Sequence, residues 1–444
     1  MSKDQSKLIP ELRFPEFENL GEWEKKMVEK LIQENILFAP KDGNHGNIHP
    51  KSSDYVKSGI PFIMASDLQN GKIDFSKCTY IKKAQADSLQ KGFSESGDVL
   101  LSHKGTVGEV ALLEDIEFPY IMLTPQVTYY RVKDKSKMSN TYLAAFFHSD
   151  LFQKSLLKVS GGGTRAYVGI TEQQKLEILY PNKIEEQQKI ASFLSSLDEV
   201  IAAHNQKLEL LKDHKKGLMQ NLFPQEGETV PRYRFPEFVS NAKWVERELN
   251  FYLEMLTDFE ANGSFADVKS NVTVYDEPNF AWYVRATDLE NNSSIEKLKF
   301  VDQKSYGFLR KTSLFGGELL ITKRGEIGKV YFFDRNDKPA TVGPNLYLLK
   351  MNEKAFPKYF YYYFRSFQGN QSLKKLNSSS TIGALYKDDV KRIRFLAPQY
   401  QEQQKIATCL SSLDALITTQ VEKVEQLEQH KIALTQGLFP KVID

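Results

Sequence analysis

The sequence predicts an α+β protein with two mixed α/β globular domains, separated by two long antiparallel coiled-coil helices and related by a pseudo-two-fold internal duplication. Three observations predict this class. Two motifs recur about 220 residues apart, a heptad spacing follows the second motif in both copies, and strand-like apolar runs lie between the motifs. The predicted bounds are 1–180 and 225–398 for the globular domains, and 181–224 and 399–444 for the helices.

The duplication rests on two motifs. Residues 13–17, Arg-Phe-Pro-Glu-Phe, return unchanged at 234–238. Residues 186–198 return at 402–414 with 11 of 13 positions identical. Average composition would supply roughly one match by chance. Because the period is far longer than the 20 to 50 residues of a solenoid repeat, it indicates two whole domains.

The helical parts carry apolar residues in alternating steps of four and three, which is the pattern of a coiled-coil seam. Polar residues interrupt both copies at matching points, His204 with Gln420 and Lys215 with Lys431. They either fix register and partner or mark solvated ends of an imperfect seam. The predicted helix-pairing residues are Ile190, Leu194, Leu197, Ile201, Leu208, Leu211 and Leu218 in the first copy, and Ile406, Leu410, Leu413, Ile417, Val424, Leu427 and Leu434 in the second.

The order of the parts predicts how the helices pair. The second helix starts at the second domain and should run back along the first helix. The N-terminal entry segment has no helix before it in the sequence. We therefore expect it to pack beside the C-terminal helix and close the repeat into a circle.

Composition excludes several classes. Charged residues make up 26% and apolar residues 41%, as in soluble globular proteins. Two distant cysteines, Cys78 and Cys409, do not make a disulfide framework, and no apolar run is long enough to span a membrane. We expect a cytoplasmic protein. The net charge of +2 neither supports nor excludes nucleic acid, since DNA binding needs local positive charge.

No catalytic or metal-binding pattern is present in the sequence. There is no P-loop, and the seven histidines lack metal-ligand spacing. There is no amino-methyltransferase motif and no convincing nuclease motif. We therefore predict no catalytic residue and no metal site, and these absences together favour a binding module.

Basic turns follow a predicted strand in both copies. Residues 102–105, Ser-His-Lys-Gly, correspond to 322–325, Thr-Lys-Arg-Gly. Each turn carries two potentially cationic side chains beside a glycine, where the backbone can approach a phosphate or a base edge. A solvated hairpin turn is the alternative. Because both copies agree, the two interpretations are close to parity.

Further residues extend this set. Residues 161–165, Gly-Gly-Gly-Thr-Arg, correspond to 378–381, Ser-Ser-Ser-Thr, and offer donors to phosphate unless they form a flexible loop. Residues 358–394 hold eight Lys/Arg against two Asp, enough to release counterions from DNA. The aromatic run 359–364 fits a buried helix better than a base-stacking surface. The DNA-binding candidates are His103, Lys104, Gln126, Thr164, Arg165, Arg285, Lys323, Arg324, Asn345, Lys374, Lys375 and Thr381.

With these residues in view, the chain resembles the specificity subunits of type I restriction–modification systems over nearly its whole length. The entry segments 13–17 and 234–238 and the repeated helices, each ending in Leu-Phe-Pro, carry the resemblance, together with the Gly-Asp/Glu-x-Leu-Leu-like segments that begin at Gly97 and Gly317. It implies two target-recognition domains that each read one half of a gapped site in double-stranded DNA.

The resemblance also implies partner subunits and indicates which of them carries each activity. Two methyltransferase subunits would dock on the helices and methylate adenine with S-adenosylmethionine. Motor–nuclease subunits would add translocation and cleavage with ATP and Mg²⁺. This chain would be non-catalytic and would hold no cofactor itself.

Two other functions stay open at this point. One is a self-contained DNA methyltransferase or nuclease, against which the missing motifs argue. The other is a coiled-coil protein-interaction adaptor without DNA readout, which a DNA footprint would discriminate.

Overall fold

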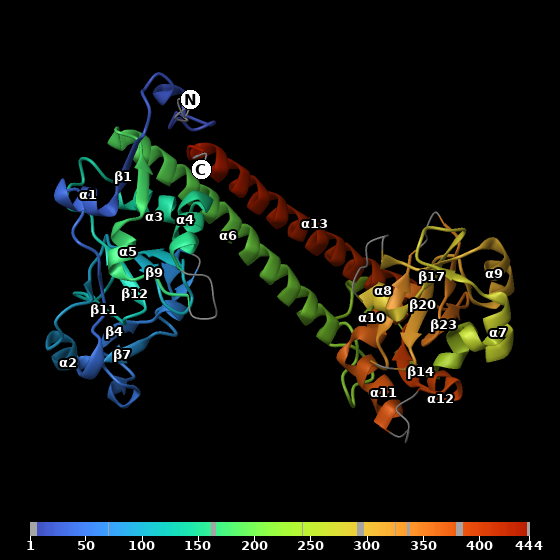
Figure 1. Ribbon diagram of the computed structural model, residues 1–444. Coiled ribbons are helices and arrows are strands. Elements are labelled where there is room, and N and C mark those ends of the chain that lie inside the picture. The colour runs from blue at the N-terminus through green and yellow to red at the C-terminus, as the bar shows by residue number, and fades with distance from the viewer. Residues whose placement is uncertain are drawn as a thin grey trace, which may run out of the picture. The chain divides into compact units, whose positions relative to one another are not determined.

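The computed structural model describes residues 7–69, 71–160, 166–241, 243–290, 297–324, 326–334, 338–378 and 385–441. The chain forms two compact units. Unit 1 comprises residues 1–205 and 423–444, and unit 2 comprises residues 206–422. Each unit is therefore built from one globular domain and parts of both long helices (Figure 1).

Unit 1 contains a mixed five-stranded sheet, a four-stranded antiparallel sheet and two strand pairs. The five-stranded sheet has the order β3 (Tyr55–Val56), β7 (Thr79–Ile81), β4 (Ile60–Ile63), β11 (Ile121–Leu123), β8 (Phe93–Ser94), with β4 and β11 parallel. The four-stranded sheet has the order β10 (Val110–Leu112), β9 (Val99–Ser102), β12 (Val127–Tyr130), β2 (Lys41–Asp42). The pairs are β1 (Glu24–Met27) with β13 (Glu177–Tyr180), and β5 (Leu68–Gln69) with β6 (Lys72–Ile73).

Unit 2 repeats the two larger sheets and the first strand pair in the same order. Its five-stranded sheet runs β16 (Val274–Tyr275), β18 (Phe300–Val301), β17 (Ala281–Val284), β22 (Ala340–Val342), β19 (Ser313–Leu314). Its four-stranded sheet runs β21 (Val330–Phe333), β20 (Glu318–Thr322), β23 (Leu346–Met351), β15 (Leu253–Asp258), and β14 (Val245–Glu248) pairs with β24 (Arg394–Ala397). The duplication and the mixed α/β class predicted from the sequence are confirmed.

Helices cover these sheets. Unit 1 has α1 (Val28–Gln33), α2 (Lys83–Asp87), α3 (Asn140–His148), α4 (Asp150–Val159) and α5 (Ile170–Gln174). Unit 2 has α7 (Phe265–Asn271), α8 (Ala286–Glu290), α9 (Gln303–Phe308), α10 (Pro357–Arg365), α11 (Phe367–Ser378) and α12 (Lys387–Lys391). The aromatic run lies in α10, where Tyr359, Phe360 and Phe364 are fully buried, as its interpretation as a core helix predicts.

The long helices are α6 (Ile184–Asn221) and α13 (Tyr400–Leu438). The fourteen predicted seam residues are all buried or half-buried in them. In unit 1, Asp198 forms an ion pair with Lys431, and Ile190 shares a core cluster with Leu438. Higher numbers on α6 therefore meet lower numbers on α13, so these segments run antiparallel.

Unit 2 contains the matching arrangement. Lys215 forms an ion pair with Asp414, and Leu222 shares a core cluster with Ile406. This ion pair is the repeat of the pair in unit 1, with the helices exchanged. The two seam lysines are thus ion-paired instead of marking solvated ends.

The N-terminal entry segment packs beside the end of α13, as predicted. The Leu12 amide donates to the Gly437 carbonyl at 2.8 Å, and the Trp23 ring lies 6.1 Å from that of Phe439. The internal copy makes the same backbone contact, from the Tyr233 amide to the Asn221 carbonyl at 2.9 Å. The N-terminal entry segment therefore contacts the end of α13 in unit 1 as its internal copy contacts the end of α6 in unit 2.

The two repeated motifs bind each other. The Arg13 guanidinium donates to both carboxylate oxygens of Glu186 at 2.8 and 2.9 Å, and the Trp23 indole donates to the same carboxylate at 3.3 Å. Lys189 lies 5.6 Å over the Phe14 ring. We call this arrangement the entry clasp, because it fixes the entry segment to the start of the long helix.

Unit 2 holds an equivalent clasp. Arg234 donates to both oxygens of Glu402 at 2.8 Å, and the Trp244 indole donates to it at 3.2 Å. Lys405 lies 5.5 Å over the Phe235 ring. These contacts explain why both motifs recur together in the sequence. Among the described residues, no helix combines the length and apolarity needed to cross a membrane.

Candidate nucleic-acid interface

Three segments of unit 1 meet at the predicted basic turn after β9. The His103 amide donates to the Gln126 carbonyl at 2.8 Å, and the Val168 amide donates to the His103 carbonyl at 3.0 Å. We call this arrangement the loop junction of unit 1. Backbone hydrogen bonds hold the turn on both sides, while the Lys104 side chain is exposed and that of Gln126 is half-buried.

Unit 2 builds the same junction after β20. The Lys323 amide donates to the Asn345 carbonyl at 2.9 Å, and the Leu385 amide donates to the Lys323 carbonyl at 3.3 Å. Asn345 has a φ of 70°, a left-handed conformation that asparagine tolerates better than most residues. Arg324 and Asn345 are exposed. The structure therefore brings six of the twelve predicted candidates together: His103, Lys104 and Gln126 in unit 1, and Lys323, Arg324 and Asn345 in unit 2.

His103 does not lie on the surface, which corrects its interpretation as a cationic turn residue. Its side chain is fully buried, and Nδ1 donates to the Val168 carbonyl at 3.1 Å. Burial lowers the pKa of His103, because the charged imidazolium is disfavoured away from water. The neutral ring stabilises the junction from inside.

Lys323 is buried as well, which corrects its assignment as a free cation. It is 4% exposed, and its Nζ lies 2.8 Å from Asp258 Oδ2 and 3.1 Å from Glu260 Oε1. A buried ammonium needs such partners to offset its lost hydration. The Lys323 charge is therefore used inside the domain, and Arg324 is the exposed cation of this turn.

A buried, ion-paired aspartate lies at the matching place on the edge strand of the four-stranded sheet in each unit. Asp42 on β2 binds Lys91 and, at 2.6 Å, His45. Asp258, at the matching place on β15, binds Lys323 and, at 2.7 Å, Lys387.

The pKa of both carboxylates reflects these partners. Burial alone would raise the pKa of Asp42 and of Asp258, but hydrogen bonds from the neighbouring cations lower both. Both groups are therefore ionised at neutral pH.

The remaining candidates divide into three groups. Arg285 is paired with Asp288, with Nη2 2.6 Å from Oδ1, so its charge is largely satisfied within the domain. Lys374 and Lys375 are exposed on α11. Thr164, Arg165 and Thr381 lie outside the described residues.

Sequence reasoning missed two exposed tyrosines beside the junctions. Tyr167 precedes Val168 and is 50% exposed, and Tyr386 follows Leu385 and is 53% exposed. Aromatic rings and cations together suit a nucleic-acid surface. Their position next to the polar stretches 161–165 and 378–381 was the available signal. Among the residues that the structure describes, no group of three or more His, Cys, Asp or Glu side chains could hold a metal ion.

Comparison with known proteins places both halves of the chain in one family. The family model described as "Type I restriction modification DNA specificity domain" matches residues 38–213 and 258–429. The putative type I restriction enzyme MjaX specificity subunit of Methanocaldococcus jannaschii is 24% identical over 396 residues, covering 84% of this chain and 85% of the relative. The type I restriction enzyme MjaIX specificity subunit of the same organism is 22% identical over 410 residues, and the match covers 88% of this chain and 88% of the relative.

Solved structures agree at the level of fold. The S subunit of a type I restriction–modification system from M. genitalium matches with a TM-score of 0.58 and 16% identity, covering 98% of this chain and all of that one. A structure described in a study of complex assembly and conformational transition of the type I R-M system matches with a TM-score of 0.55 and 14% identity, covering 95% and 98%.

Proposed function

Because the chain belongs to the family of type I restriction–modification DNA specificity proteins, we propose that its two domains read the two halves of a gapped DNA site. It is a DNA sequence-specificity subunit, and the resemblance drawn from its sequence is confirmed. As a member of this family it is non-catalytic.

The repeated loop junction is the observation that carries the proposal. The backbone arrangement is the same in both units, but the exposed side chains differ: Lys104 and Gln126 in unit 1, Arg324 and Asn345 in unit 2. Arg or Lys suits the acceptors of guanine in the major groove, and Asn or Gln suits adenine. Different donor side chains on the same backbone arrangement fit two half-sites of different sequence.

The chemistry of restriction and modification belongs, on this proposal, to partner subunits. Two methyltransferase subunits dock on α6 and α13 and bring S-adenosylmethionine, and motor–nuclease subunits bring ATP and Mg²⁺. Exposed apolar residues on the long helices support docking there. Val200 and its repeat Leu416 are 44% and 58% exposed.

The adaptor without DNA readout finds no support. The curated relatives are named as restriction enzyme specificity subunits, and both halves of the chain match a DNA specificity domain.

A hydroxyl-radical footprint on host DNA, made with the chain and its methyltransferase partner, tests the proposal. We expect two protected patches separated by an unprotected gap. A single continuous patch, or no protection at any sequence, would contradict the reading of two half-sites.

A further inference from the structure

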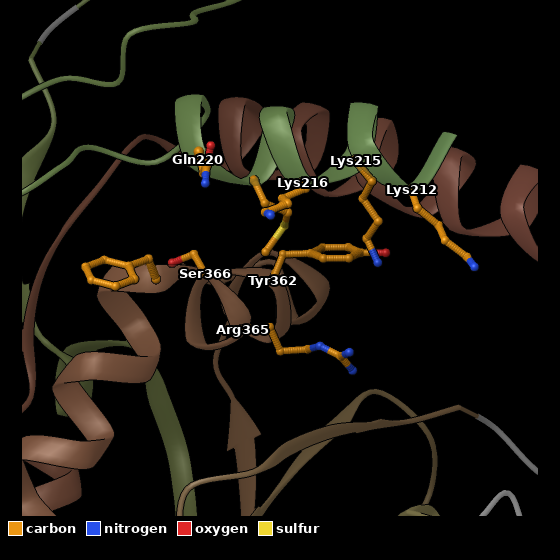
Figure 2. A pocket seen from close by; sticks show the side chains of 9 residues that line it. Lys212, Lys215, Lys216, Gln220, Tyr362, Arg365 and Ser366 are labelled. Atoms are coloured by element: carbon orange, nitrogen blue, oxygen red, sulfur yellow. The ribbon is translucent and has the colours of Figure 1, made fainter. Parts of the chain in front are cut away.

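A cavity of about 310 Å³ lies in unit 2 between the last turns of α6 and the junction of α10 with α11. Figure 2 shows Lys212, Lys215, Lys216 and Gln220 of α6 facing Tyr362, Arg365 and Ser366 across it. Met219 and Phe367 complete the lining. We call this cavity the basic pocket.

The lining carries four cations and no carboxylate. Lys215 is fixed, because it pairs with Asp414, whose other oxygen accepts from the Tyr362 hydroxyl at 2.6 Å. The Arg365 guanidinium stacks 5.0 Å from the Tyr361 ring, which holds it at the rim. Lys216 is exposed. Lys212 pairs with Glu209 at 2.7 Å, so two of the four cations are partly neutralised. Lys216 and Arg365 keep the rim of the pocket positive.

The internal repeat shows that the fold does not require this charge. Lys212 and Lys216 correspond in unit 1 to Glu428 and Ile432. Arg365 corresponds to His148, and Phe367 to Asp150, which accepts a hydrogen bond from Gln436 at 3.1 Å. The scaffold contacts repeat, as the Asp198–Lys431 pair demonstrates, but the basic pocket belongs to one copy.

The pocket is lined by Lys, Arg and Gln side chains, which are types that bind phosphate in DNA complexes. The buried Ser366 hydroxyl donates instead to the Tyr363 carbonyl at 2.6 Å. Further positive charge lies on α11, which starts at the pocket and carries exposed Lys374 and Lys375. Leu373 of this helix lies against Gly328, in the turn between β20 and β21 that also holds Arg324. A helix of 12 residues spans about 17 Å, or roughly five base-pair steps. This continuity favours DNA over an acidic protein segment.

We propose that the basic pocket binds a backbone phosphate of the DNA duplex, within about five base pairs of the half-site that unit 2 reads. The inference rests on the proposed function. It adds a contact that holds the duplex without reading its sequence. This contact lies on the helical scaffold and not on the loops of the junction, and it serves only the half-site that unit 2 reads.

The test compares two double variants of the full chain with its methyltransferase partner. Lys216→Gln with Arg365→Gln removes two rim cations but leaves the Lys215–Asp414 pair intact. Lys207→Gln with Lys304→Gln removes two exposed lysines of the same unit that do not line the pocket. Affinity is measured from low to high KCl on duplexes with the cognate site and with each half scrambled, and ethylation interference locates the phosphates contacted.

For the pocket variant we expect roughly tenfold weaker binding to every duplex. The slope of log affinity against log salt should fall by about one, with half-site preference unchanged. The ethylation-interference signal that the wild type gives at a phosphate beside the second half-site should disappear. The control variant should keep that signal.

Three outcomes separate the possibilities. Equal behaviour of the pocket and control variants overturns the phosphate site. Loss of partner assembly, with DNA binding by the free chain unchanged, overturns it in favour of an acidic protein segment. If the wild type does not distinguish cognate from scrambled duplexes, the proposed function fails instead, and the salt slopes still report on the pocket.

Discussion

Arg324 and Lys323 are neighbours on one turn but have different surroundings. Arg324 is exposed at the loop junction, whereas Lys323 is buried against Asp258. In unit 1 the same two places hold Lys104, which is exposed, and His103, which is buried. The exposed residue of each pair, Lys104 or Arg324, is therefore accessible at the surface, and the buried one, His103 or Lys323, supports the loop from inside.

Replacing Arg324 with Ala should weaken discrimination at one base pair of the second half-site by about 1 to 3 kcal/mol. Competition binding with single-base variants of the site measures this. Lys104→Ala is the matched change in unit 1 and should affect the first half-site alone. An effect of Arg324→Ala on the first half would contradict the assignment.

Replacing Lys323 with Met should destabilise unit 2 by about 3 kcal/mol, because it leaves the buried Asp258 carboxylate with one cation fewer. Urea unfolding monitored in unit 2 measures the change. Arg324→Met, at the exposed neighbour, should cost little. A loss below about 1 kcal/mol for Lys323→Met would show that the buried pair is not a main support of the junction.

Sequence reasoning found the turns but could not separate their exposed residues from their buried ones. A lysine after a strand is usually solvated, but Lys323 is a core residue because Asp258 and Glu260, more than 60 residues earlier in the chain, pair with it. His103 is equally ambiguous, since a histidine is charged or neutral according to its surroundings. Both assignments depended on partners distant in the chain.

The entry clasp joins a short extended segment to the start of a long helix in each unit. Glu186 is 1% exposed and accepts hydrogen bonds from Arg13 and Trp23. The clasp therefore fixes where α6 leaves the domain. The equivalent contacts of Glu402 do the same for α13.

Glu186→Ala should destabilise unit 1 by about 3 kcal/mol, because the largely buried Arg13 guanidinium loses its carboxylate. Thermal or urea unfolding measures this. Glu185→Ala, at the exposed neighbouring position, is the control and should change the unfolding free energy by less than about 0.5 kcal/mol. If both variants unfold alike, the clasp is not a structural support.

The long helices were the most predictable elements. A heptad pattern is local, so positions such as Leu194 and Leu410 could be placed on the seam without knowing the partner. The basic pocket could not be predicted, because Lys216 and Arg365 come from segments about 150 residues apart. The strand order of the sheets could not be predicted either, because hydrophobic periodicity is a local pattern and does not show which strands pair.

The duplicated fold gives the whole molecule two reading domains on repeated helices. If those helices set the distance between half-sites, as the sequence predicts, seven residues inserted after Gln206 and seven after Glu422 should lengthen the gap. Seven residues add about 10.5 Å of helix, which is roughly three base pairs. Selection of bound sequences from a random duplex pool measures the gap. An unchanged gap would refute this role.

The most direct test of two independent reading domains exchanges residues 225–398 for the second domain of another family member and maps methylated adenines across the host genome. We predict that one half of the methylated motif is replaced while the other half is retained. Replacement of both halves, or of neither, would contradict the account.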